Sequence, residues 1–457
     1  MNFSKYSLAV LVLIATLTFT ACEAPAPQSS SVVPPQSKVE QLDWTKNASI
    51  YEINVRQFSE EGTFNAVREE LPRLKEMGIR ILWLMPVHPI GEINRKGSLG
   101  SYYSVADYKD VNPNFGTKED FRALVDEAHE MGFKVIIDWV ANHTAWDNPW
   151  TANPDWYELN EQGEFIPPRG TDWTDVIQLD YTNENMRAAM IEALEYWVRD
   201  MDIDGYRCDV AGMVPTDFWV EAIDSLNQIK PVFMLAEDGE PELVVEAFQM
   251  NYAWAYAHMI REVAKGDSTF TDLTELINDN EKRFPRSAYR MYFTSNHDEN
   301  SWTGSDSAMY GDNFENFAVL SATISGMPLI YNGQETGLNE QLEFFEKDPI
   351  QWDGYEYQNL YTTLLKLKRD EEALWNGAYG AEPEFIKMPE GMFAYSRAKG
   401  ESEVIVALNF NSENGMNQVA LADLGVDESY TTYNSESILV TSDSVSLSPN
   451  EWVIFVK

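Results

Sequence analysis

The chain has 457 residues, 44% of them hydrophobic, which allows a sizeable core and exceeds what one core of ordinary size usually holds. Its formal net charge of −41 argues against nucleic acid and against electrostatic attraction to an anionic membrane, because both require a basic face. The two cysteines, Cys22 and Cys208, exclude a disulfide framework.

The N-terminal segment is typical of an export signal followed by a tether. A basic residue precedes an apolar run at 8–17 that is too short to span a membrane on its own. Small residues then precede Cys22, and this arrangement resembles a bacterial lipoprotein signal, in which the cysteine is lipidated. Secretory cleavage after Ala21 is the alternative. We predict a signal peptide at 1–21, a disordered tether rich in Pro, Ser and Gln at 22–44, and an exported protein whose only membrane contact is the lipid.

From residue 45 the pattern alternates between strands and helices. A strand over 49–58, a helix over 64–77 and a strand over 79–85 form a βαβ unit, which implies parallel pairing. Later strands are predicted at 134–138, 203–209, 232–237, 290–294 and 328–331. About eight such repeats in roughly 320 residues predict a (β/α)8 TIM barrel over 45–375. A doubly wound sheet is the competing fold, but no glycine-rich phosphate loop follows the first strand.

Two segments depart from this alternation. The connection at 144–181, after the third strand, is rich in Trp, Pro, Asp and Asn and lacks helical periodicity. We expect it to form a short excursion beside the barrel mouth. At 376–457 apolar and polar residues alternate between turns that contain Gly, Asn and Ser, which predicts a C-terminal all-β sandwich domain.

Polar side chains follow several of the predicted barrel strands. The C-terminal ends of the strands form one rim of such a barrel, and the active site lies there. The residues at these positions are Asp138, Asn142, His143, Asp209, Glu237, Asn296, His297, Asp298 and Glu335. Crowded carboxylates push each other's pKa values apart, so one can be ionised while another is protonated. This combination suits the cleavage of a glycosidic bond.

Arg207 and Asp209 lie two residues apart in one strand, so their side chains share a face. The guanidinium is expected to lower the pKa of Asp209 and keep it ionised. Taken alone, the pair favours a structural ion pair over a nucleophile, and it is the carboxylates at other strand ends that favour the nucleophile. The sequence contains no HExxH motif, Cys/His cluster, phosphate loop or GxSxG elbow, so no metal or cofactor is expected.

Four segments resemble, in order and spacing, the conserved segments of the α-amylase family of glycoside hydrolases. They are 138–143 (Asp-Trp-Val-Ala-Asn-His), 205–209 (Gly-Tyr-Arg-Cys-Asp), Glu237, and 296–298 (Asn-His-Asp). The resemblance extends over nearly all of the chain after the tether. It implies a retaining hydrolase that cleaves α-1,4-glucosidic bonds of starch or maltodextrins through a covalent glycosyl-enzyme.

The resemblance also implies a role for individual residues. Asp209 would be the nucleophile, Glu237 the general acid and then base, and Asp298 the group that stabilises the distorted sugar. The residues expected to bind substrate are Tyr103, His143, Arg207 and His297. Tyr102 is the rival of Tyr103 for stacking on the sugar, and Asp138 is expected to brace the guanidinium.

Two departures from the family pattern concern calcium. Residues 210–213 read Val-Ala-Gly-Met where many relatives carry Lys-His, and Gln178 replaces a calcium ligand, although Asn142 remains. Calcium requires several oxygen ligands, so we predict that the usual family calcium site is absent and that the protein needs no cofactor.

Two other functions remain open at this stage. A glucanotransferase would use the same residues and pass the sugar to another sugar instead of to water. A non-catalytic glucan-binding relative is the alternative from another class. The complete set of Asp209, Glu237 and Asp298 disfavours it, because binding alone does not require all three.

Overall fold

The computed structural model describes residues 33–411, 416–433 and 438–457. The predicted signal peptide and Cys22 lie outside these residues, so export and lipidation stay predictions. In the described part of the chain, none of the helices combines the length and the apolar character that a membrane span requires.

Eight parallel strands form a closed barrel in the order β1, β2, β3, β6, β7, β8, β9, β10. Their bounds are β1 Ile50–Ile53, β2 Ile81–Leu84, β3 Lys134–Trp139, β6 Gly205–Cys208, β7 Phe233–Ala236, β8 Met250–Tyr252, β9 Tyr289–Tyr292 and β10 Met327–Tyr331. Nearly every strand residue is buried, as parallel strands covered on both faces require. The structure confirms the predicted TIM barrel.

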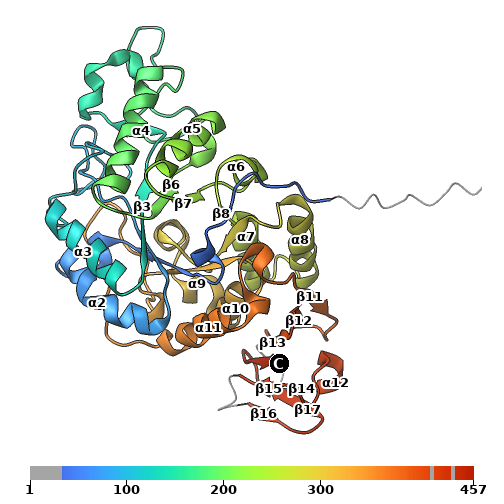
Figure 1. Ribbon diagram of the computed structural model, residues 1–457. Helices are drawn as coiled ribbons and strands as arrows, with labels where there is room; N and C mark the ends of the chain where they lie inside the picture. Colours follow the sequence, from blue (N-terminus) through green and yellow to red (C-terminus); the bar gives the residue numbers. More distant parts are fainter. Residues whose placement is uncertain (1–32, 412–415, 434–437) are drawn as a thin grey trace, which may run out of the picture. The chain divides into compact units, whose positions relative to one another are not determined.

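Helices surround the strands (Figure 1). They are α1 Val55–Phe58, α2 Phe64–Met77, α3 Lys118–Glu130, α4 Glu184–Arg199, α5 Thr216–Asn227, α6 Pro241–Glu246, α7 Trp254–Lys265, α8 Phe270–Arg283, α9 Asp306–Tyr310, α10 Phe314–Thr323 and α11 Gln358–Asp370. Local sequence sets their ends. Gly78, with a φ of 95°, closes α2, and Thr117 begins α3 with a capping box to Asp120.

Side chains on the barrel strands divide into two clusters because they alternate between the two faces. One cluster fills the barrel interior and includes Ile50, Trp83 and Phe233. The other joins the outward side chains, such as Tyr51, to the apolar faces of the helices. This division leaves the C-terminal strand ends free to carry polar groups.

The predicted excursion is present after the third strand. It contains the antiparallel pair β4 His143–Ala145 and β5 Val176–Gln178, with the short turns η2 Pro149–Ala152 and η3 Pro154–Trp156 between them. The register places His143 opposite Gln178. The excursion therefore begins and ends beside the strand that carries Asp138.

The last part of the predicted tether is ordered, which corrects the prediction of disorder for residues 37–44. The hydroxyl of Ser37 donates to the carbonyl of Val244 at 2.7 Å, and the amide of Gln41 donates to that of Gln249 at 3.0 Å. Leu42 and Trp44 pack against the interior cluster of the barrel. The composition of the tether could not reveal that carbonyl acceptors and apolar surface elsewhere in the chain would hold it in place.

The C-terminal region is a β-sandwich, as predicted, and it also contains one short helix, α12 Leu421–Leu424. One sheet contains β11 Glu384–Ile386, β12 Met392–Lys399, β13 Ser402–Asn409, β15 Thr431–Thr432 and β18 Trp452–Val456, and the other contains β14 Asn417–Ala420, β16 Leu439–Val440 and β17 Ser444–Leu447. Side chains of both sheets share one apolar layer. The buried Arg397 on β12 joins this region to the barrel by donating to the carbonyl of Thr323 at 2.9 Å.

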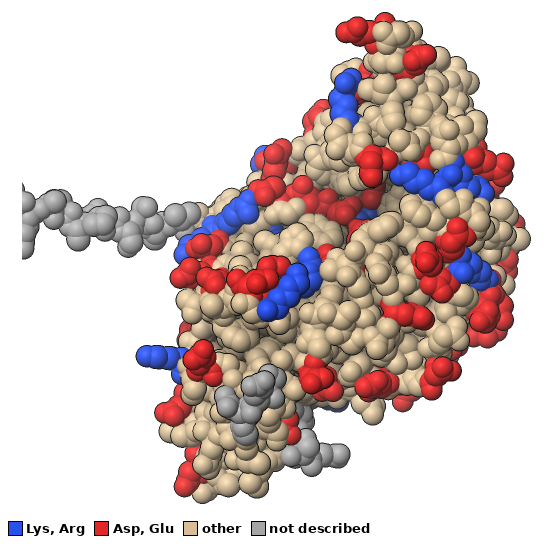
Figure 2. Space-filling model, turned by 180° about the vertical axis from the view of Figure 1, so that it is seen from behind, with Lys and Arg blue, Asp and Glu red and all other residues tan. Residues whose placement is uncertain are grey.

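Acidic side chains are spread over the face shown in Figure 2, where they outnumber Lys and Arg. The sequence has 74 Asp and Glu against 33 Lys and Arg. This surface agrees with the exclusion of polyanionic partners.

Candidate active site

A cavity of about 500 Å³ opens at the C-terminal ends of the barrel strands. Asp209 directly follows β6, Glu237 directly follows β7, and Asp298 follows β9 by six residues. All three side chains line the cavity. The structure thus brings together three acids that are widely separated in the sequence.

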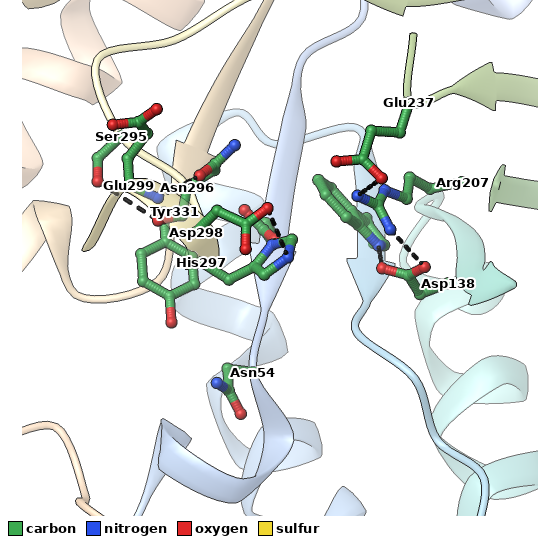
Figure 3. A network of polar contacts seen from close by, with 12 residues as sticks. Asn54, Asp138, Arg207, Glu237, Ser295, Asn296, His297, Asp298, Glu299 and Tyr331 are labelled. Carbon is green, nitrogen blue, oxygen red and sulfur yellow. Dashed lines mark hydrogen bonds and ion pairs between the residues drawn. The ribbon is translucent and has the colours of Figure 1, made fainter. Parts of the chain in front are cut away.

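Arg207 holds the carboxylates beneath the cavity. It is 1% exposed, and its Nη1 lies 2.8 Å from Oδ1 of Asp138 and 3.1 Å from Oδ1 of Asp209. Its Nη2 lies 2.8 Å from Oε2 of Glu237, so the guanidinium sits between Glu237 and Asp138 (Figure 3). Asp209 and Glu237 therefore share one guanidinium. This close pairing suits a retaining glycosidase, whose two carboxyl groups lie roughly 5–5.5 Å apart.

Burial and the neighbouring carboxylate of Glu237 raise the pKa of Asp209 well above its ordinary value, although Arg207 acts in the opposite direction. The expectation that Arg207 keeps Asp209 ionised was incomplete, because one guanidinium shared with two other carboxylates does not offset the burial of Asp209 and its repulsion by Glu237 and Asp138.

The contacts of Glu237 distinguish its two carboxyl oxygens. Its Oε2 accepts the backbone N–H of Val210 at 2.8 Å as well as the contact from Arg207. Both donors use the same oxygen, which leaves Oε1 to carry a proton. An acid group with one fixed oxygen and one protonated oxygen beside a cavity can act as a general acid.

Asp138 lies under the site and is fully buried. Besides Arg207, it accepts hydrogen bonds from Nε1 of Trp83 at 3.3 Å and from the hydroxyl of Tyr103 at 3.2 Å. Burial raises its pKa to about 6, and Arg207 limits the rise. Asp138 therefore orients the guanidinium, which matches the bracing role expected for it.

Tyr103 presents its ring to the cavity, whereas Tyr102 does not. Tyr102 is 1% exposed and lies under the guanidinium of Arg56, whose Cζ is 3.9 Å from the ring centre. Tyr103 lines the cavity and stacks on His297, with ring centres 5.6 Å apart and planes inclined by 26°. Of the two rivals, Tyr103 is the one that lines the cavity.

The two predicted histidines both line the cavity but differ in charge. Burial lowers the pKa of His143 to about 4, and its Nδ1 accepts from the amide of Asn142 at 3.2 Å, so its proton is on Nε2. Burial alone would lower the pKa of His297 too, but Asp298 and Glu52 beside it raise the pKa to about 9. His297 is therefore charged at neutral pH.

Sequence reasoning missed Glu52, which is fully buried and lies 2.5 Å from Nδ1 of His297. The sequence feature that could have identified Glu52 is that it is a single acidic residue within the apolar strand β1. Sequence reasoning also overrated Glu335, which lies beyond β10 on the same rim. Glu335 accepts from Nη1 of Arg73 at 3.0 Å and from the hydroxyl of Tyr51, so it faces the helix layer.

Aromatic rings line two sides of the cavity. Trp173 comes from the excursion and lies 5.5 Å from the ring of His143. Trp302 lies in the single helical turn Glu299–Thr303, is 58% exposed, and packs on Phe344 with ring centres 5.2 Å apart. Such rings are apolar platforms for sugars.

The residues at the usual family calcium position do not fit a calcium ion. Nε2 of Gln178 donates to both the backbone carbonyl and Oδ1 of Asn142, each at 3.0 Å. Both acceptors are oxygens, so the Gln178 side chain must turn its NH2 group, and not its carbonyl oxygen, toward Asn142. An N–H group therefore occupies the oxygens of Asn142 that would otherwise bind the cation. In the described ranges, no cluster of three or more His, Cys, Asp or Glu could hold a metal ion. The absence of the site remains a prediction.

Comparisons with known proteins agree with this geometry. The family model described as "Alpha amylase, catalytic domain" matches residues 45–171 and 171–390. Alpha-amylase MalA of Haloarcula japonica is 28% identical over 436 residues, which covers 89% of this chain but only 62% of that protein. The crystal structure of an alpha-amylase from Lactobacillus plantarum superimposes with a TM-score of 0.80 at 29% identity, covering 91% of this chain and 99% of that one. A maltogenic alpha-amylase, AmyB from Thermotoga neapolitana, gives 0.79 at 29% identity, covering 90% and 99%.

Proposed function

Since the chain belongs to the alpha-amylase family by its match over residues 45–390, we propose that it is a retaining α-glucan hydrolase that cleaves α-1,4-glucosidic bonds of starch or maltodextrins. The observation that carries the proposal is the single guanidinium of Arg207, which holds Asp209 and Glu237 side by side on the wall of one cavity.

In the first step, Asp209 attacks the anomeric carbon. Its Oδ1 is held by Arg207, so Oδ2 is the oxygen that forms the new bond. Glu237 gives the proton on Oε1 to the glycosidic oxygen, whose bond to the anomeric carbon breaks. The product is a glycosyl-enzyme and a shortened glucan.

In the second step, the ionised Glu237 takes a proton from water. The resulting hydroxide attacks the anomeric carbon, and the carboxylate of Asp209 leaves. Two inversions give net retention of configuration. Asp298 offers a carboxylate to the hydroxyls of the distorted sugar, and Tyr103, beside His297, supports its ring.

A neutral glucan suits the chemistry of the cavity. Its wall combines carboxylates with the aromatic faces of Tyr103, Trp173 and Trp302. Carboxylates accept hydrogen bonds from sugar hydroxyls and repel anionic sugars, and the rings stack on the apolar faces of pyranoses. Transfer to a second sugar is the runner-up, because the exposed ring of Trp302 offers a platform to an acceptor as well.

The test is incubation with maltoheptaose, with products separated by chromatography. Shorter maltooligosaccharides alone would support hydrolysis, longer chains would support transfer, and unchanged substrate would refute both. Glu237→Gln should lose turnover and keep glucan binding. Glu240→Gln is the matched control, because Glu240 is exposed and pairs with Arg283 outside the cavity.

We further propose that the protein is exported and anchored through a lipid on Cys22, a proposal supported by the sequence pattern before that residue. Cys22→Ser should abolish labelling by a radioactive fatty acid and release the protein from the membrane fraction. We also propose that catalysis needs no calcium, supported by the amide of Gln178 at the family position. Activity should therefore be unchanged by a chelator.

A further inference from the structure

His297 has a carboxylate at each ring nitrogen. Oε1 of Glu52 lies 2.5 Å from Nδ1. Oδ2 of Asp298 lies 3.4 Å from Nε2, and Figure 3 labels this second pair. A neutral imidazole carries one N–H group, so it would turn a lone pair toward one of these carboxylates. Only the doubly protonated ring gives each carboxylate a donor.

The hydroxyl of Tyr103 leads to the same protonation state. Its oxygen lies 2.7 Å from Nε2 of His297 and 3.2 Å from Oδ2 of Asp138. The hydroxyl has one proton, and when it donates to Asp138 its oxygen must accept from an N–H on His297. His297 then donates to Tyr103, and Tyr103 donates to Oδ2 of Asp138. The other oxygen of Asp138 accepts from Arg207.

Every charged group around His297 belongs to this arrangement. Glu52 lies in β1, Asp138 in β3 and Arg207 in β6, and Asp298 is the next residue along the chain. The edge of Trp83 closes one side, with ring centres 6.0 Å apart. Two carboxylates in contact with the ring outweigh one guanidinium further away, which agrees with the raised pKa of His297.

We propose that Glu52 is a positioning residue that keeps His297 doubly protonated, so that its Nε2–H group holds Tyr103 and Asp298 in place for the sugar. The inference rests on the proposed function for its kinetic consequence. Glu52 is fully buried in the first strand and acts on the substrate only through His297. Its carboxylate supplies the negative charge that a protonated histidine requires in a buried position.

The first test is the titration of the histidines by NMR in protein labelled at the imidazole carbon. Five histidines give few signals, and His297→Asn assigns the one of interest. We expect His297 to be an imidazolium at pH 7.5 and to lose its proton near the value of about 9 given above. In Glu52→Gln the pKa of His297 should fall by at least about one unit. A neutral His297 in the unmodified protein at pH 7.5 overturns the proposal.

The second test is the pH profile of glucan cleavage. In Glu52→Gln, kcat should fall by about 10–100-fold with KM changed by less than about threefold, because the positioned groups act on the distorted sugar. The alkaline limb of kcat should move to lower pH. Glu52→Asp keeps the charge and should restore the limb toward its original position.

Glu335→Gln is the matched control. Glu335 is a fully buried carboxylate that bonds to Tyr51, the neighbour of Glu52 in β1, and lies outside the cavity. This variant should lose stability without any shift of the alkaline limb or of the His297 signal. If Glu52→Gln behaves like this control, Glu52 is merely structural and the proposal is wrong.

The two proposals fail separately. An unmodified protein that leaves maltoheptaose intact would refute the glucan hydrolase, whereas the NMR titration needs no turnover. If the protein cleaves maltoheptaose and the His297 signal is unchanged in Glu52→Gln, only the role of Glu52 is refuted. Where Glu52→Gln does not fold, Glu52→Asp and the titration of the unmodified protein decide the question.

Discussion

Two buried clusters of charge at the same rim of the barrel differ in their balance. Arg207 contacts three carboxylates, two of which line the cavity. Arg73 contacts Glu335 at 3.0 Å and Glu70 at 2.6 Å, and Glu335 also accepts from the hydroxyl of Tyr51. The Arg207 cluster sets one cation against three carboxylates next to open space, whereas the Arg73 cluster sets one cation against two and lies outside the cavity. An imbalance of buried charge beside a cavity distinguishes a reactive site from a structural one.

The largest expected effect is the loss of turnover in Asp209→Asn. An amide cannot form the glycosyl-enzyme, so kcat should fall by at least about 10⁴-fold, as for other enzymes that lose a nucleophile or its partner. Initial rates on maltoheptaose measure it. A variant that keeps a tenth of the activity would exclude Asp209 as the nucleophile. The Arg207 cluster would then no longer differ in function from the Arg73 cluster.

Stability should change in opposite directions in the two clusters. Glu335→Gln leaves the buried Arg73 without its fully buried partner and should lower the free energy of unfolding by about 3 kcal/mol. Asp209→Asn removes one of three crowded carboxylates and should leave stability equal or raise it. Urea unfolding of both variants at neutral pH provides the measurement, and equal losses would contradict the difference in charge balance.

The charge on His297 predicts a pH dependence of stability. Its pKa is about 9 in the folded protein, above the unfolded value of 6.5. Its contribution is fully present below pH 6.5 and is lost as the pH rises through 9, a change of roughly 3 kcal/mol. Thermal unfolding between pH 6 and pH 10 should show this loss, and His297→Asn should lack it.

His143 offers the matched control for this pH dependence, because its pKa is lowered to about 4 in the folded protein. Its contribution is present above pH 6.5 and is lost as the pH falls through 4, so His143→Asn should alter only the acid side of the profile. An alkaline slope that survives in His297→Asn would show that another group causes it.

The smallest expected effect separates two tryptophans near the two clusters. Trp302→Ala should raise KM by about fivefold, the loss of about 1 kcal/mol of stacking, with kcat changed little. Trp352 packs on the guanidinium of Arg73, 5.0 Å from its ring centre, and donates to the carbonyl of Phe58. Trp352→Ala should lower the melting temperature and leave KM unchanged. If Trp352→Ala raised KM and Trp302→Ala did not, Trp302 would not contact the substrate.

The barrel and the main acids could be predicted because their signals are local. Apolar runs of strand length followed by Asp209 or Glu237 place an acid at a strand end, and closure of the barrel gathers those ends. Strand β8 was not located in advance, because its three residues, Met-Asn-Tyr, are short and interrupted by a polar side chain. Its pairing with β7 and β9 is what makes it a strand.

The features that could not be predicted depend on the direction in which a side chain points and on contacts with residues far away in the sequence. Glu335 and Glu237 both follow barrel strands, and nothing nearby in the sequence tells which side chain enters the cavity and which turns to the helices. Glu52 is 245 residues from His297, so its partner became visible only in three dimensions. The ordered end of the tether was missed for the same reason.

Arg397 makes the C-terminal sheets a poor candidate for removal. Its guanidinium reaches the carbonyls of Thr323 at 2.9 Å and Trp375 at 3.3 Å, both from the barrel side of the chain. A truncation after residue 375 would strip these acceptors of their donor and uncover Phe270 and Phe317, which pack against Phe410. Such a shortened chain would expose this apolar surface to water and aggregate. The smallest useful catalyst therefore retains both the barrel and the C-terminal sandwich.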